Sequence, residues 1–253
     1  MSRGLGDVYK RQILNIPEDV MSVSDFTKGM VLVTGPAGSG KSTTMACIVD
    51  RINHSREGHI ITLEDPLEYL HRHDKCIVSQ REICTDTESY LVSLRATLRQ
   101  SPDVILLGEM RDYETIQTAM TAAETGHLIL SSLHTTGAAN TIGRIVDVFE
   151  PAQQRQISIQ LSMVLQAVIS QQLIPDINGH TIPVFEVMRL NPAIRNMIRD
   201  NKVHQIDGVI ASSAHEHMRS MDQSLLELYK QNKITKETAL KFASNADMLK
   251  RKL

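Results

Sequence analysis

The segment GPAGSGKST, residues 35–43, has residue types and spacing suited to phosphate binding. Its glycines let the backbone curl until N–H groups face phosphate oxygens, and a helix beginning there adds partial positive charge. Lys41 would reach the β- and γ-phosphates, and the Ser42 hydroxyl would ligate Mg²⁺. The apolar run VLVT precedes this loop. The predicted nucleotide-binding residues are Gly35, Pro36, Ala37, Gly38, Ser39, Gly40, Lys41, Ser42 and Thr43.

Acids and histidines adjoin three further apolar runs. HIITLEDP ends in Glu64 and Asp65, VILLGE ends in Glu109, and HLILSSLHTT is bracketed by His127 and His134. Ligands gather at the carboxyl ends of parallel strands. Phosphoryl transfer needs positioning and charge neutralisation, so Glu109 is the candidate for orienting or deprotonating the attacking water. Glu64 would hold a magnesium-bound water or share that role, and Glu109 would also reach the metal through water. His134 would donate to a γ-phosphate oxygen.

Each of these side chains also fits an ordinary structural role. A glutamate after an apolar strand, such as Glu109, is commonly a solvated turn residue. Gly108 stands where many nucleotide hydrolases carry a magnesium-binding aspartate. His127 fits a turn or a helix end, and His134 fits a helix cap. Their occurrence together with the phosphate loop favours the catalytic interpretation.

Strand-like and helix-like segments alternate from Met30 onward, which predicts an α/β P-loop NTPase fold: a RecA-like three-layer core with a mainly parallel sheet. Asp112 has the position of a helix N-cap. The predicted strands are MVLVTG, HIITLED, KCIVSQ, VILLG and HLILSSL, and the predicted helices include 42–54 and 87–99.

The pattern changes after Pro151 and indicates a mainly helical C-terminal region. We expect a long helix over 153–173, an edge strand at TIPVFEVMRL because of Pro183, a short helix after Asn191, and short helices from Gly208. The predicted organisation is a non-native or disordered leader at 1–12, a remnant of a linker or N-terminal domain at 13–28, a P-loop ATPase core at 29–150, and the helical region at 151–253. A native flexible linker is the alternative for 1–12.

Composition excludes several classes of protein. The chain has 253 residues, a net charge of −2 and no tryptophan. It has no apolar run near the roughly 20 residues that span a bilayer and no signal-peptide core. Near-neutral charge and few aromatic residues offer no nucleic-acid surface. The three cysteines make neither a zinc spacing nor a disulfide framework and are typical of a reducing cytoplasm.

These segments together resemble the secretion ATPases, and within that family the retraction ATPases of type IV pili, from about Gly29 to about His217. GPAGSGKST resembles the Walker A loop and IITLEDPLEYLH the aspartate box. SPDVILLGEMRD resembles the family's atypical Walker B strand, in which glycine precedes the glutamate. TAAETGHLILSSLHTT resembles the histidine box. LQAVISQQLI and AIRNMIRDNKVHQI resemble stretches of the retraction branch rather than the assembly branch.

The resemblance implies Mg²⁺-dependent ATP hydrolysis by a cytoplasmic hexamer that powers pilus retraction and twitching motility. Such a ring would reach the inner membrane through a platform protein, without inserting into it. Glu109 would be the catalytic acid, Glu64 a second essential acid and His134 the contact to the γ-phosphate, with His127 and Asp65 in support. A neighbouring subunit would supply positive charge, and residues in the right region are Arg81, Arg95, Arg99 and Arg111. Most of the family's N-terminal domain would precede this chain.

Three rival functions remain open. A pilus assembly or type II secretion ATPase commonly carries a four-cysteine zinc insertion, whereas this chain has no cysteine after Cys84. A non-hydrolysing accessory subunit would have lost the loop lysine or an acid, and both Lys41 and Glu109 are present. A RecA-like nucleic-acid motor is disfavoured by the charge balance.

Overall fold

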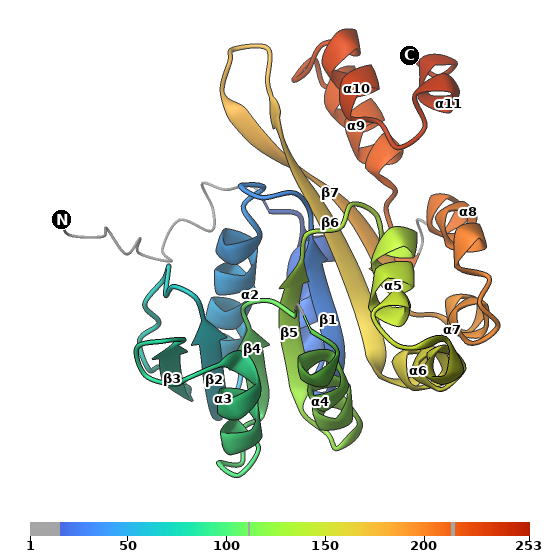
Figure 1. Ribbon diagram of the computed structural model, residues 1–253. Helices are drawn as coiled ribbons and strands as arrows, with labels where there is room; N and C mark the ends of the chain where they lie inside the picture. The colour runs from blue at the N-terminus through green and yellow to red at the C-terminus, as the bar shows by residue number, and fades with distance from the viewer. Residues whose placement is uncertain (1–15, 111, 214–215) are drawn as a thin grey trace.

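The computed structural model describes residues 16–110, 112–213 and 216–253 (Figure 1). The leader expected at 1–12 lies outside these residues. The strands are β1 (Gly29–Thr34), β2 (Gly58–Glu64), β3 (Cys76–Glu82), β4 (Val104–Leu107), β5 (Leu128–Leu133), β6 (Leu165–Pro175) and β7 (Thr181–Arg189). The helices are α1 (Glu18–Met21), α2 (Lys41–Ser55), α3 (Tyr90–Thr97), α4 (Tyr113–Glu124), α5 (Ala138–Asp147), α6 (Pro151–Val164), α7 (Pro192–Arg199), α8 (Ile206–Ser212), α9 (Met221–Lys230), α10 (Lys236–Phe242) and α11 (Ala246–Lys250). Two 3-10 helices are η2 (Ser22–Asp25) and η3 (Val203–Gln205).

The described strands form a seven-stranded sheet in the order β3-β2-β4-β5-β1-β6-β7. Every neighbouring pair is parallel except β6 and β7, which form an antiparallel hairpin. The prediction of an α/β fold with a mainly parallel sheet is therefore confirmed. The carboxyl ends of β1, β2, β4 and β5 lie at one edge, which is where ligands bind in sheets of this kind.

Helices cover both faces of the sheet, as Figure 1 shows. Alternate residues of each strand point to opposite faces. Met30 and Leu32 of β1 join the core cluster that includes residues of α4, α5, α6 and α7. Val31 and Val33 join the second cluster with residues of α2 and the N-terminal helices. This arrangement gives three layers, because the central strands are buried on both faces.

Local signals in the sequence place several helix ends correctly. The Asp112 side chain accepts a hydrogen bond from Thr115 N at 2.8 Å and caps α4. Asn191 caps α7 in the same way, with Ile194 N as the donor. The strand that contains Pro183 is β7, at the edge of the sheet. Short polar side chains favour such caps because they satisfy N–H groups that the helix leaves unpaired.

The single long helix expected over 153–173 is wrong in its second half. Helix α6 ends at Val164, and Leu165 begins β6, which pairs in parallel with β1. Residues 165–189 thus add two strands to the main sheet, and the helical character expected after Pro151 holds for α6 and from α7 onward. Residues 165–173 mix apolar and polar side chains and are mostly buried, and a short run of this kind does not distinguish a strand from a helix by periodicity.

The last three helices gather beside the far half of the β6–β7 hairpin, which extends beyond the rest of the sheet (Figure 1). A third apolar cluster holds them there, with Ile174 and Val184 from the hairpin and Met221 and Leu225 from α9. The C-terminal helices therefore have a small core of their own that is anchored on strands of the main sheet. None of the helices within the described residues combines the length and apolarity that crossing a bilayer requires.

Candidate active site

The phosphate loop connects β1 to α2 in the conformation that anion binding requires. Gly40 has a φ of 83°, in the left-handed region that glycine tolerates best. The first helical hydrogen bond of α2 runs from Thr44 N to Gly40 O at 3.1 Å. The N–H groups of Lys41, Ser42 and Thr43 therefore precede the helical ladder and are available to phosphate oxygens.

Gly35 is required by the strand beside the loop. A Cβ at Gly35 would lie 2.1 Å from the carbonyl oxygen of Gln171 on β6, a distance that no side chain tolerates. The Gln171 side chain is buried and accepts a hydrogen bond from Thr44 Oγ1 at 2.7 Å. Strand β6 therefore forms the back wall of the phosphate loop.

The loop lysine is buried and folds back onto its own loop. Lys41 Nζ donates to Gly35 O and Pro36 O, each at 2.9 Å. Burial lowers the pKa of Lys41, and the nearby carboxylates of Glu109 and Glu68 oppose that shift. Two backbone carbonyls thus hold the ammonium at the position from which it would engage phosphate.

The aspartate-box segment after β2 is tied to the start of α2. Ser42 Oγ donates to Glu68 Oε1 at 2.9 Å, and the hydroxyls of Thr43 and Tyr69 are 2.7 Å apart. Glu68 therefore reaches the Ser42 hydroxyl, which is the predicted magnesium ligand. Sequence reasoning missed Glu68, although it lies only four residues after Glu64.

The ends of β4 and β5 bring the predicted acid and histidine together. Glu109 Oε2 lies 3.6 Å from His134 Nε2, and the Glu109 side chain is only 13% exposed. Both residues line a cavity of about 150 Å³ beside the phosphate loop. The cavity also contains the side chain of Glu64, whose pKa is raised by burial. The lining residues are Ser42, Met45, Ala46, Glu64, Asp65, Pro66, Glu68, His71, Tyr90, Leu106, Gly108, Glu109, Ser132 and His134.

Gly108 is the residue that the packing at the end of β4 demands. A Cβ there would lie 2.8 Å from the Tyr90 hydroxyl and 3.2 Å from the Leu63 carbonyl oxygen. The backbone at Gly108 is fixed on both sides, since its N–H donates to Leu63 O at 2.8 Å and its carbonyl accepts from Ser132 Oγ at 2.6 Å. The strand is intact, and the residue after Gly108 is Glu109, the predicted catalytic acid.

The predicted residue His127 is not part of this cavity. It precedes Leu128 at the amino end of β5, whereas the cavity lies at the carboxyl end, roughly 17 Å away along a six-residue strand. Its Nδ1 is 2.9 Å from Ala122 O, so it closes the turn after α4. Of the two histidines that bracket this strand, only His134 reaches the site.

Three of the predicted arginines, Arg81 on β3, Arg95 on α3 and Arg99 just after α3, do not line the cavity. Arg81 donates to Thr97 Oγ1 and Gln100 Oε1, and Arg95 forms a 3.7 Å ion pair with Glu114. Arg99 follows the end of α3, and Arg111 lies outside the described residues. A role for any of them across a subunit interface remains a prediction.

His71 is a further cavity residue that the sequence did not single out. Burial lowers its pKa to about 4, so the imidazole is neutral near pH 7. Its backbone N–H donates to Gln80 Oε1 at 2.8 Å, which fixes the segment at the edge strand β3. A neutral ring adds no positive charge to the cavity.

We expect His71 to make the fold sensitive to acid. The unfolded chain takes up a proton at His71 near pH 6.5, whereas the folded chain does so only near pH 4. Stability is therefore lost as pH falls between these values, by about 2–3 kcal/mol at pH 4.5. Urea unfolding at pH 7.0 and pH 4.5 measures this loss of unfolding free energy. The loss in His71→Gln should be smaller than in the unmodified protein by that amount. An equal loss in both proteins would contradict the buried neutral state.

The oxygen-rich side of the cavity suits a hard divalent cation. No group of three or more His, Cys, Asp or Glu in the described parts of the chain is arranged to hold a metal by itself. The Ser42 hydroxyl and the carboxylates of Glu64, Glu68 and Glu109 nevertheless provide oxygen atoms beside the phosphate loop. Mg²⁺ is commonly held by few protein ligands together with substrate phosphates, and these residues fit that mode.

Comparisons with known proteins show the family to which the chain belongs. Residues 17–250 match the family described as type II/IV secretion system protein. The chain is 47% identical over 236 residues to the type IV pilus retraction ATPase PilT of Pseudomonas aeruginosa, covering 93% of this chain and 65% of that protein. It is 46% identical over 243 residues to a twitching motility protein of Neisseria gonorrhoeae, covering 96% and 65%. A crystal structure of the pilus retraction motor PilT with bound ADP matches with a TM-score of 0.89 and 46% identity, over 98% of this chain and 69% of that one.

The sheet and the phosphate loop define a P-loop fold of the RecA-like class. The chain belongs to the type II/IV secretion system protein family. It spans 65% of the length of each of the two curated relatives named above.

Proposed function

We propose that this chain is the ATP-hydrolysing part of a hexameric motor that powers retraction of type IV pili. The observation that carries the proposal is the meeting of four segments around one cavity: the end of the phosphate loop with Ser42, the aspartate-box segment with Glu68, the end of β4 with Glu109 and the end of β5 with His134. The ADP bound to the similar PilT structure supports a nucleotide as the ligand.

In this proposal each side chain has a distinct task. Lys41 and the loop N–H groups hold the phosphates, and His134 donates to a γ-phosphate oxygen. Glu109 accepts a proton from the attacking water or orients it, because a largely buried carboxylate beside a histidine is placed for that role. Mg²⁺, when bound, neutralises phosphate charge. Ser42 would be its ligand, with Glu64, Glu68 and Glu109 reaching it through water.

The wider setting also belongs to the proposal. The full-length protein would form a homo-hexamer, with positive charge from a neighbouring subunit completing each site. It would work in the cytoplasm and reach the inner membrane through a platform protein. High identity to PilT supports retraction over the alternatives of pilus assembly and type II secretion. A non-hydrolysing accessory subunit is the other alternative, and a measurement of ATP turnover would distinguish it from an ATPase.

Steady-state ATP hydrolysis with Mg²⁺, followed together with oligomer size by light scattering, tests the enzymatic part. We expect turnover that rises with assembly. Binding without turnover, which persists when the N-terminal part of a relative is fused ahead of Gly29, would support the accessory subunit instead. Retraction is tested by replacing the matched region of Pseudomonas aeruginosa PilT with residues 17–250 and measuring twitching. A folded, ATP-hydrolysing chimera that restores no twitching would contradict the retraction role.

Glu68 is expected to control the magnesium dependence of turnover. Glu68→Gln keeps the size of the side chain but weakens its hold on the Ser42 hydroxyl and removes a charge near the metal. Loss of such a supporting group typically costs about 10–100-fold in metal affinity. The Mg²⁺ concentration for half-maximal turnover should rise accordingly. Glu57→Gln, an exposed residue outside the cavity, is the matched control. If both variants show the same dependence of turnover on Mg²⁺ concentration, Glu68 does not support metal binding and Glu64 becomes the candidate for that role.

A further inference from the structure

Glu186 on β7 is a buried charge that lies outside the nucleotide cavity. Among the charged side chains of the described residues, only Lys41 and Glu186 are buried. The burial of Lys41 is explained by its hydrogen bonds to carbonyls of the phosphate loop. A buried carboxylate is costly unless hydrogen bonds compensate it, so the partners of Glu186 indicate what the residue does.

Those partners are the first residues of two helices. Glu186 Oε1 accepts from Ala138 N, at the start of α5, at 2.9 Å. Glu186 Oε2 accepts from Met221 N, at the start of α9, at 3.4 Å. Each helix N-terminus carries partial positive charge, so one carboxylate stabilises both ends. Helix α5 has no side-chain cap of its own, because its N-cap is Gly137.

The α5 end is continuous with the residue assigned to the γ-phosphate. His134 follows β5, and only three residues separate it from Ala138. This short segment is braced along its length: the Thr135 and Thr141 hydroxyls are 2.7 Å apart, and Gly137 N donates to Ser170 Oγ at 2.9 Å. Because this segment is short and held by hydrogen bonds, a displacement of His134 is transmitted to the N-terminus of α5.

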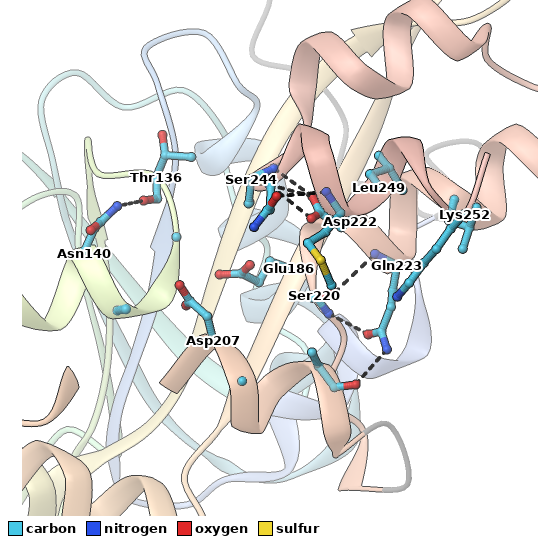
Figure 2. A pocket seen from close by; sticks show the side chains of 17 residues that line it. Thr136, Asn140, Glu186, Asp207, Ser220, Asp222, Gln223, Ser244, Leu249 and Lys252 are labelled. Carbon is cyan, nitrogen blue, oxygen red and sulfur yellow. Dashed lines mark hydrogen bonds between the residues drawn. The ribbon is translucent and has the colours of Figure 1, made fainter. Parts of the chain in front are cut away.

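The α9 end belongs to the C-terminal helices, which have their own small core. A cavity of about 600 Å³ lies between them and α5, and Glu186, Asp207 and Asp222 are in its walls. Figure 2 shows Glu186 between the side chains of Asn140 and Asp207 on one side and those of Ser220 and Asp222 on the other. Close-packed interiors transmit strain but resist rearrangement, whereas this open space allows the two helix ends to shift.

We propose that Glu186 is a positioning residue that couples the His134 segment to the C-terminal helices, by holding the first N–H of α5 and the first N–H of α9 with one carboxylate. Gain or loss of the γ-phosphate at His134 then changes the packing of α9, α10 and α11. The coupling rests on the proposed function, since it needs ATP and ADP to be distinguished at His134.

Glu186→Gln separates this role from a simple structural one. The amide oxygen still accepts one hydrogen bond, but the amide nitrogen accepts none, so one helix end is released while the volume is kept. Burial raises the pKa of Glu186, with Asp207 and Asp222 adding to the rise against the Ala138 and Met221 N–H groups. The substitution therefore removes a charge that the surroundings of Glu186 already oppose, and thermal midpoints of both variants check that the fold is intact. Asp207→Asn is the matched control, because it neutralises a carboxylate in the same cavity that does not hold either helix end.

Hydrogen–deuterium exchange with ADP and with ATP, in a Glu109→Gln background that retains ATP, measures the coupling. We expect the nucleotide to change exchange at residues 35–43, 135–141 and 220–224. With Glu186→Gln, the change at 135–141 should persist and that at 220–224 should fall at least fivefold, whereas Asp207→Asn should keep both. Conversion to aspartate, Glu186→Asp, shortens the reach and should behave like Glu186→Gln.

Two results would overturn the coupling, and they are distinguishable from failure of the proposed function. An unchanged response at 220–224 in Glu186→Gln would show that another path carries the signal. A response at 135–141 without one at 220–224 in the Glu109→Gln background alone would show that the two helix ends are independent. If residues 35–43 gain no protection from ATP, the proposed nucleotide function itself fails, and the coupling fails with it.

Discussion

Glu109→Gln is expected to lower ATP turnover by about 10²-fold or more while leaving ATP binding intact, the usual scale for loss of a general base. Glutamine has nearly the same shape, so the 3.6 Å approach to His134 and the packing of the largely buried side chain are kept. What is lost is the negative charge that orients the attacking water and accepts its proton. Steady-state hydrolysis and equilibrium binding of a fluorescent ATP analogue measure the two quantities separately.

Glu114→Gln provides the control for that experiment. It is the same chemical change five residues further along, at a surface ion pair with Arg95, and should alter turnover little. Normal turnover in Glu109→Gln would remove this residue from the chemistry and make Glu64 the leading base.

Lys41→Ala is expected to weaken ATP binding by about 100-fold or more. Lys41 Nζ is held by two loop carbonyls and is the one ammonium group buried in the described part of the chain. Charged hydrogen bonds contribute about 1.5–3 kcal/mol each, and each 1.4 kcal/mol corresponds to a tenfold change in affinity. Isothermal titration with ATP and Mg²⁺ gives the affinity directly.

Lys28→Ala is the matched control, because Lys28 is exposed and precedes β1. The thermal midpoint of Lys41→Ala should be recorded as well, since an intact fold is needed to interpret the binding. Unchanged ATP affinity in a folded Lys41→Ala protein would refute the role assigned to the phosphate loop.

The parts of the site that lie directly at strand ends could be predicted from the sequence. In a parallel sheet the carboxyl ends of neighbouring strands meet at one edge, so the positions of Gly35, Glu64, Glu109 and His134 follow once the strands are recognised. The apolar strands are short and bounded by polar residues, which makes them recognisable. The fold class follows from the same alternation of strands and helices.

Residues that reach the cavity through irregular backbone could not be predicted in this way. Glu68 and His71 come from the loop after β2, which turns back over the start of α2 and is fixed there by Ser42 and Gln80. Loop geometry depends on such tertiary contacts rather than on periodicity. A glutamate that follows another acid by four residues was the available signal. His127 was predicted in the site but lies away from it, because two histidines that bracket one strand lie at its opposite ends.

The pairing of β6 with β1 limits how far this chain can be shortened for expression. A cut at residue 150 would remove the β6 neighbour of β1 and leave backbone N–H and C=O groups of β1 unpaired at a new sheet edge, which favours intermolecular pairing. It would also remove the carbonyl and side chain of Gln171 that back the phosphate loop. A fragment that keeps the paired sheet and the wall behind the phosphate loop must therefore continue at least through the hairpin that ends at Arg189.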